Sequence, residues 1–263
     1  MAIKALSLAE FLSASNLPDL LNLPWVHSTA SQNLFDILSS QRILATPCTV
    51  FKGEELCYLF VGRPAYKTPS VPNPSSWQLP VAFVVRFRKP PPLKHVHPFD
   101  SGAFFNKRLP TYITNFQLER FDLASNPALM GRLVSLMFKT PARYMSREPV
   151  GDYEFKNDNN LDMRHQEILA LAKLYRDNSS AEFDDRAAAI EIAIEEDIEL
   201  TKDNILGVVI PGEYARVPKL VREMKTFAPM VKTYDLQPLS TASHFGNLYD
   251  CVAEIYKKSG IKY

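Results

Sequence analysis

The chain has few of the features that mark a secreted, membrane-spanning or metal-binding protein. Its three cysteines, Cys48, Cys57 and Cys251, match no metal-ligand spacing. The N-terminus has no basic region followed by an apolar core and a small-residue cleavage site. No apolar run approaches the roughly 20 residues that cross a bilayer. These absences predict a cytoplasmic protein without a membrane partner.

Several common catalytic motifs are also missing. The sequence contains no Gly-x-Gly-x-x-Gly loop, no Walker-type loop and no Gly-x-Ser-x-Gly elbow. His95 and His97 could ligate a metal, but no cysteine or carboxylate cluster completes the set. We therefore expect no metal cofactor.

Length and composition predict one globular domain over residues 1–263. Of the 263 residues, 46% are hydrophobic, which is enough for a sizeable core. The net charge of +1 excludes a generally basic surface, but the charge is segregated. Residues 81–147 carry 11 Lys/Arg and 3 Asp/Glu, a difference of +8, and residues 182–203 carry 2 and 9, a difference of −7.

Each charged segment has a functional interpretation and a plainer one as a solvated face. The basic segment is interleaved with aromatic residues, which suits stacking and phosphate attraction in single-stranded nucleic acid binding. These aromatics are Phe87, Phe99, Phe104, Phe105, Tyr112, Phe116 and Phe121. The acidic segment 181–200 is predicted to be an amphipathic helix that could contact a partner.

Residue patterns predict an α+β order of elements. Strands are expected at 25–27, 49–51, 56–60, 81–87, 205–210 and 230–234. Helices are expected within 5–23 and at 31–40, 127–139, 181–200, 218–224 and 247–257. Residues 152–162 are expected to form a loop, and 167–175 fit a strand or a helix. An elaborated insert is expected at about 88–155.

Candidate ligand-binding residues are concentrated between Trp25 and Lys67. His27 and Thr29 are two apart, so a strand would place both side chains on one side. An imidazole and a hydroxyl can hold ribose hydroxyls, although a lone histidine is more often structural.

An arginine follows the next apolar strand. Arg63 lies in a Gly-Arg-Pro loop, where a guanidinium can clamp a diphosphate in bidentate fashion or simply face solvent. Tyr58 and Tyr66 could offer aromatic faces to a flat ring, although core packing also explains Tyr58.

Glu167 is the candidate acid. It stands between a charged run and the apolar run that starts at Ile168. In a cleft, its carboxylate could stabilise positive charge developing on a sugar during glycosidic cleavage. As a cap or surface residue it would have no such role.

Taken together, these residues resemble the ADP-ribosyltransferase superfamily, and most closely its DarT-like toxins that modify nucleic acid. The resemblance rests on His27-x-Thr29, Asn33-Leu34-x-x-Ile37-Leu38, Tyr58-Leu-Phe60-Val-Gly-Arg63 and Arg164-x-x-Glu167. It covers the first quarter of the chain and the 160s. It implies a split, strongly bent β-sheet core with peripheral helices.

The resemblance also implies site roles. NAD as substrate would be held by His27, Ser28, Thr29, Asn33, Tyr58, Phe60 and Tyr66. Glu167 and Arg63 would be catalytic, with Glu167 at the nicotinamide ribose as nicotinamide leaves. Arg164, His165, Lys107 and Arg108 are expected to bind the acceptor.

The leading hypothesis is therefore a toxin that transfers ADP-ribose from NAD to a DNA or RNA base, with an antitoxin partner or a role in phage defence. The alternatives are a protein acceptor, an inactive nucleotide-binding sensor, an RNA-processing phosphotransferase on the same fold, and a structural protein without a site.

Overall fold

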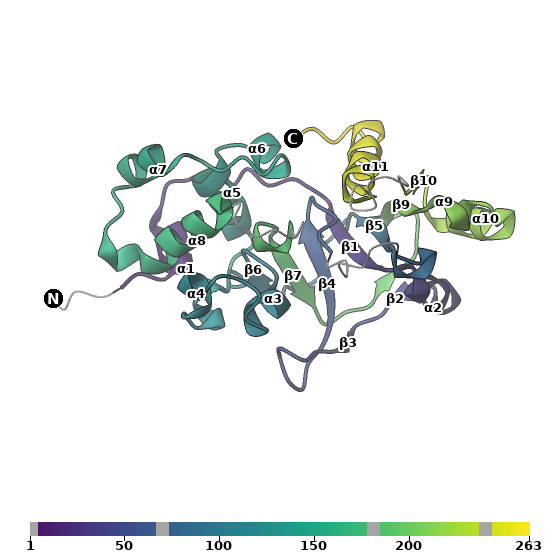
Figure 1. Cartoon of the computed structure of the whole chain (residues 1–263), viewed down its shortest axis with the longest axis horizontal. Coiled ribbons are helices and arrows are strands. Elements are labelled where there is room, and N and C mark those ends of the chain that lie inside the picture. Colours follow the sequence, from purple (N-terminus) through teal and green to yellow (C-terminus); the bar gives the residue numbers. More distant parts are fainter. Residues whose placement is uncertain (1–4, 67–73, 178–184, 237–243) are drawn as a thin grey trace.

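The computed structural model describes residues 5–66, 74–177, 185–236 and 244–263. It is an α+β structure with a mixed sheet, and Figure 1 shows most helices gathered at the two ends of that sheet. The described helices are α1 (Leu8–Ala14), α2 (Leu34–Ser40), α3 (Ser101–Phe105), α4 (Thr111–Thr114), α5 (Ala128–Phe138), α6 (Pro141–Met145), α7 (Asp152–Asn159), α8 (Gln166–Arg176), α9 (Gly212–Ala215), α10 (Pro218–Phe227) and α11 (His244–Lys258).

The main sheet has the strand order β10-β9-β5-β1-β4-β7-β6, and β3 pairs with β4 outside that path. Its strands are β1 (Trp25–Ala30), β3 (Thr46–Pro47), β4 (Glu55–Val61), β5 (Pro80–Val85), β6 (His95–His97), β7 (Glu191–Ile194), β9 (Ile205–Pro211) and β10 (Met230–Tyr234). Among the strand pairs of the described residues, β9–β10 alone is parallel. A separate pair joins β2 (Arg42–Ile43) to β8 (Ile198–Glu199).

The sheet opens between β1 and β4. All six residues of β1 pair with β5, whereas only Trp25 and Val26 pair with β4. Beyond Val26, the His27 imidazole spans the opening, and its Nδ1 donates a hydrogen bond to the Tyr58 carbonyl oxygen at 2.8 Å. The two central strands therefore diverge on the side that faces the candidate site.

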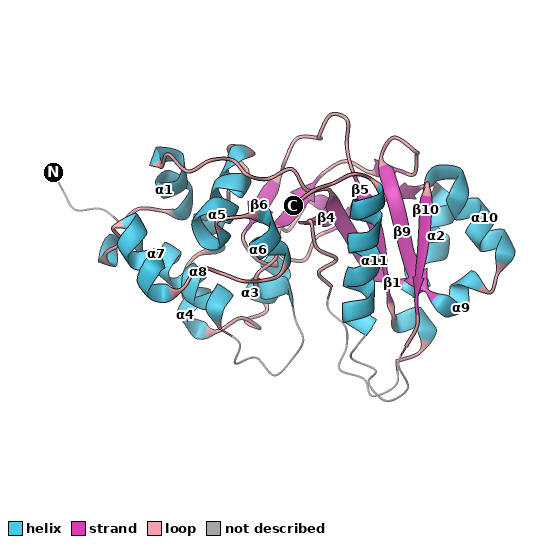
Figure 2. Cartoon of the chain, turned by 90° about the horizontal axis from the view of Figure 1, so that it is seen from above, coloured by secondary structure: helices cyan, strands magenta, loops and turns pink. Residues whose placement is uncertain are grey.

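Helix α11 lies across β5, β9 and β10 (Figure 2). Gly207 of β9 permits this close approach, since a Cβ there would come within 2.7 Å of the Ile255 side chain. At the opposite end, α1 and α3–α8 pack beside the β6 edge. The predicted 88–155 insert thus supplies both an edge strand of the sheet and much of this helical end.

Most predicted elements are confirmed, including the strands at 56–60, 81–87 and 230–234 and the helices at 127–139 and 218–224. Three predictions are wrong. Residues 49–51 are not extended, residues 152–159 form α7 instead of a loop, and the described part of 181–200 contains β7 and β8 instead of a helix. The rest of that last segment, 181–184, lies outside the described residues.

The basic segment 81–147 does not present its aromatic residues to solvent. Phe99, Phe104 and Phe121 are buried and pack on one another with ring centroids 5.2 to 6.2 Å apart. Among the seven aromatics proposed to stack on bases, only Phe105 is largely exposed, at 52%. The expected stacking surface is therefore mostly core.

Candidate functional site

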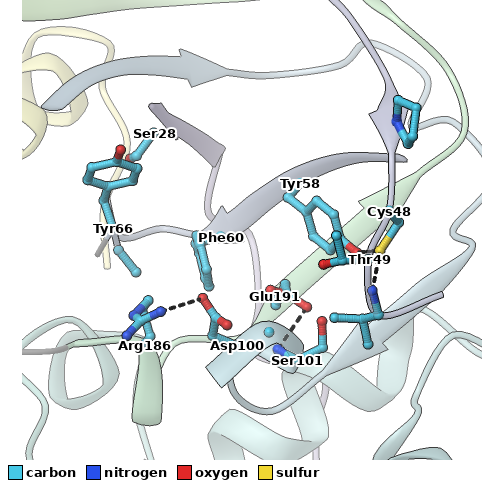
Figure 3. A pocket seen from close by; sticks show the side chains of 14 residues that line it. Ser28, Cys48, Thr49, Tyr58, Phe60, Tyr66, Asp100, Ser101, Arg186 and Glu191 are labelled. Atoms are coloured by element: carbon cyan, nitrogen blue, oxygen red, sulfur yellow. Dashed lines mark hydrogen bonds and ion pairs between the residues drawn. The ribbon is translucent and has the colours of Figure 1, made fainter. Parts of the chain in front are cut away.

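A cavity of about 320 Å³ lies over β4 and β7, beside the place where β1 and β4 diverge. Four parts of the chain form its walls. They are β1, the segment from β3 through β4 to the loop after it, the start of α3, and β7 with the turn before it. The lining residues are Ser28, Pro47, Cys48, Thr49, Val50, Tyr58, Phe60, Ala65, Tyr66, Asp100, Ser101, Gly102, Arg186 and Glu191, and Figure 3 shows most of them around one space. The cavity is open to solvent and within the usual size of small-ligand sites.

Strand register explains how Glu191 reaches this cavity. Side chains alternate along a strand, so Tyr58 and Phe60 point to the same face of β4. Glu191 of β7 is the direct partner of Phe60, which places its carboxyl on that face. Neighbouring strands on both sides of β7 bury it at 4% exposure.

The surroundings of Glu191 favour its neutral form. Burial, aided by the negative charge of Asp100, raises its pKa to about 8. The backbone N–H of Ser101 donates to Glu191 Oε1 at 3.2 Å, and the charge of Arg186 acts in the opposite direction to burial. At neutral pH the Glu191 carboxyl is therefore largely protonated, and a cation placed beside it would favour ionisation.

Other polar groups around the cavity are arranged by their local structure. Asp100 caps α3 by accepting from the Ala103 N–H, and it lies 3.6 Å from the Arg186 guanidinium. The buried hydroxyl of Ser28 has no hydrogen-bond partner among the described residues. Buried hydroxyls are normally satisfied, so this one is available to a polar ligand. The Ser101 hydroxyl faces Glu191 and opposes the rise in its pKa by hydrogen bonding.

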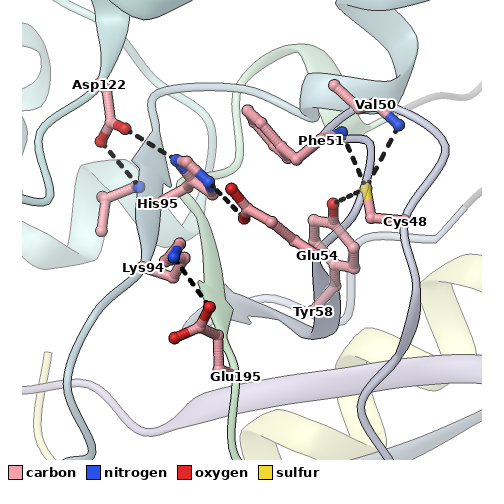
Figure 4. A network of polar contacts seen from close by, with 10 residues as sticks. Cys48, Val50, Phe51, Glu54, Tyr58, Lys94, His95, Asp122 and Glu195 are labelled. Atoms are coloured by element: carbon pink, nitrogen blue, oxygen red, sulfur yellow. Dashed lines mark hydrogen bonds and ion pairs between the residues drawn. The ribbon is translucent and has the colours of Figure 1, made fainter.

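A polar network holds the β3–β4 loop against β6 (Figure 4). The His95 imidazole contacts Glu54 at 2.9 Å and Asp122 at 3.0 Å, and it stacks on Phe51 with centroids 3.8 Å apart. Cys48 accepts hydrogen bonds from two backbone N–H groups of the same loop. Because this loop forms one wall of the cavity, the network fixes the shape of that wall.

Of the seven residues predicted from sequence to hold NAD, four line the cavity and three do not. Ser28, Tyr58, Phe60 and Tyr66 all line the cavity. His27, Thr29 and Asn33 do not line it. Burial lowers the pKa of His27, which bonds to Tyr58 as described above. Thr29 Oγ1 accepts from the Asn33 amide at 2.8 Å, so these two groups satisfy each other.

Arg63 does not reach the cavity, contrary to its predicted role as a ligand clamp. Its side chain is completely buried. One guanidinium N–H donates to the Tyr144 carbonyl at 2.9 Å, another nitrogen lies 3.0 Å from Asp185, and the guanidinium stacks on the Tyr144 ring at 4.6 Å. Asp185 immediately precedes Arg186 in the chain. Arg63 therefore supports the turn that carries Arg186.

Glu167 lies in the first turn of helix α8 and does not begin a strand. It is buried, pairs with Arg120 and does not line the cavity. Of the predicted acceptor residues next to it, Arg164 bonds to Asp162, and His165 packs edge-on against a phenylalanine of α1. The contact of His165 with α1 joins the N-terminal segment to the helical end of the molecule.

Lys107 and Arg108, the other predicted acceptor residues, are exposed just after α3. The first turn of α3 lines the cavity. The exposed Phe105 ends this helix, and the two cations come directly after it in the chain.

The sequence interpretation missed Glu191, Asp100, Ser101 and Arg186. A signal for Glu191 was present, since Ile190, Ile192 and Ile194 alternate with period two, which is typical of a strand. The helical spacing of other residues in the acidic segment obscured this alternation.

Within the described residues, no group of three or more His, Cys, Asp or Glu side chains could hold a metal ion. Among the described helices, none is both long and apolar enough to cross a bilayer. No family model, curated protein or solved structure matches the chain.

Proposed function

We propose that the chain is an NAD-dependent mono-ADP-ribosyltransferase in which Glu191, and not Glu167, is the carboxylate beside the reacting sugar. The observation that carries this proposal is a buried carboxyl group at an open cavity, next to two tyrosines and a phenylalanine. The opening between β1 and β4 supports the split sheet that the resemblance implies.

The residues of the cavity fit the chemical groups of NAD. Tyr58, Phe60 and Tyr66 offer aromatic surface for the nicotinamide ring. The unpartnered Ser28 hydroxyl could bond to a sugar hydroxyl. Arg186 is a cation in the cavity wall and could hold a phosphate oxygen.

NAD supplies a glycosidic bond whose leaving group, nicotinamide, departs neutral. As that C–N bond breaks, ionised Glu191 would stabilise the positive charge that develops on the ribose. A nitrogen or oxygen of the acceptor then bonds to the same carbon and loses its proton to solvent. Because the pKa of Glu191 is raised in the empty cavity, the positive charge of the nicotinamide ring would itself promote the ionisation that the reaction needs.

We further propose a nucleic-acid base as the acceptor. Phe105, Lys107 and Arg108 are exposed at the end of α3, whose first turn lines the cavity, and an aromatic ring near cations in the chain suits a base and its phosphates. Modification of nucleic acid would be toxic in the cytoplasm, so the proposal includes an antitoxin or a phage-defence setting.

The test uses purified protein and NAD labelled in the adenylate moiety, with single-stranded DNA, RNA or a protein extract as acceptor. We expect label on one nucleic acid. Label on protein alone would replace the acceptor part of the proposal. Neither transfer nor release of nicotinamide with any acceptor would contradict the enzymatic proposal and favour a binding module.

A further inference from the structure

Large apolar side chains are exposed at the end of the sheet opposite the helical end. Phe35 of α2 and Trp77 of the turn before β5 are each 58% exposed, and Val217 between α9 and α10 is 50% exposed. The Phe35 ring lies 6.2 Å from the ring of Tyr214 in α9. Soluble proteins rarely group such side chains at the surface without a function.

Contacts between the elements bring these side chains to one region. The Ser76 hydroxyl donates to Glu213, which joins the turn that carries Trp77 to α9. Helices α9 and α10 are consecutive and pack against β9 and β10. Figure 1 shows α2, α9 and α10 together at this end of the molecule.

The same region carries cations that pair with no carboxylate in the described part of the chain. Arg216, Lys219, Arg222 and Lys225 are all exposed, and none forms an ion pair with a described residue. By contrast, Arg42, Arg88 and Lys94 pair with carboxylates. The last three cations of the region recur every third residue along α10, so they lie near one another on its surface.

We propose that this surface binds single-stranded nucleic acid. We define it as the α2–α10 surface: Phe35, Trp77, Tyr214 and Val217 with Arg216, Lys219, Arg222 and Lys225. Aromatic rings stack on unpaired bases, and adjacent cations attract the phosphates. Two exposed carboxylates, Asp36 and Glu213, also lie on this surface, and Glu213 accepts a hydrogen bond from Ser76.

The α2–α10 surface is separate from the cavity. The cavity is built from β1, β4, β7 and α3, and none of its lining residues comes from α2, α9 or α10. Binding at this surface requires neither NAD nor Glu191, so it can be measured even if the proposed reaction fails.

The test measures fluorescence anisotropy of labelled 20-nucleotide dT and rU strands with the wild-type chain and two variants. Phe35→Ala/Trp77→Ala is expected to weaken binding about tenfold or more through lost stacking. Arg216→Gln/Lys219→Gln/Arg222→Gln is expected to weaken binding and to lower the slope of log K against log salt by about 2, since each phosphate contact contributes about 0.7 on single strands.

A matched control is Lys52→Gln/Lys89→Gln/Lys262→Gln, which removes the same charge from exposed lysines elsewhere. This control should bind nearly as well as wild type. Equal loss in the control would overturn the proposal in favour of non-specific attraction. Binding of duplex as tight as that of single strands would also overturn it. So would the result that both surface variants bind the strands like wild type and lose binding only to phosphatidylserine vesicles. Since every substituted side chain is exposed, the variants should keep the wild-type melting temperature.

Discussion

Glu191→Gln is expected to lower kcat/KM for nicotinamide release from NAD by about 10²- to 10³-fold, because it removes one preorganised electrostatic group. Gln keeps the size of the side chain but cannot carry a negative charge beside the developing sugar cation. Since the native carboxyl is buried and largely neutral at pH 7, the substitution should leave the fold intact. Steady-state kinetics with circular dichroism of both proteins measures the two effects.

Glu167→Gln is the matched control. Glu167 is also buried, but it pairs with Arg120 at the helical end and does not line the cavity. We expect this variant to keep most of the activity. Loss of activity in Glu167→Gln at unchanged fold, with Glu191→Gln active, would reverse the assignment and support the interpretation made from sequence.

Arg63→Ala is expected to lower the free energy of unfolding by about 3 kcal/mol, because Asp185 loses its cation and keeps only the hydrogen bond from the Tyr249 hydroxyl among the described contacts. The substitution also removes the stacking on Tyr144 and the hydrogen bond to its carbonyl. Urea unfolding measures the change. Arg63→Lys keeps the charge and should lose less stability.

An exposed ion pair provides the comparison. Arg88 pairs with Asp203, but its side chain is 81% exposed, so Arg88→Ala should cost less than about 1 kcal/mol. A similarly small loss for Arg63→Ala, accompanied by weaker NAD binding, would show that Arg63 contacts ligand after all.

Local sequence was sufficient to predict elements whose hydrophobic pattern and length agree. The strand Met230–Tyr234 and the helix of residues 128–138 are examples, because the pattern of apolar residues within each segment already indicates its type. The strand at 80–85 is also predictable, because nearly every residue is apolar as expected between two partner strands.

The candidate site was less predictable because it depends on contacts between distant segments. Arg63 looked like a ligand clamp until Asp185, far along the chain, proved to be its partner. Glu167 and Glu191 both border apolar runs, and only the pairing of β7 with β4 distinguishes the one that reaches the cavity. Tyr58, Phe60 and Tyr66 were found because they belong to one strand and the loop that follows it.

Calorimetry of NAD binding tests most directly whether the nicotinamide end of NAD lies beside Glu191. Titration at pH 7 with an NAD analogue whose glycosidic bond cannot break, in two buffers of different ionisation enthalpy, gives the number of protons released by binding alone. The pKa of Glu191 is about 8 without ligand, and a nearby cation lowers it. We therefore expect close to one proton released by the wild-type protein and none by Glu191→Gln, with binding to wild type tightening as pH rises towards 8. Equal proton release by both proteins, or no NAD binding to either, would contradict the proposed site.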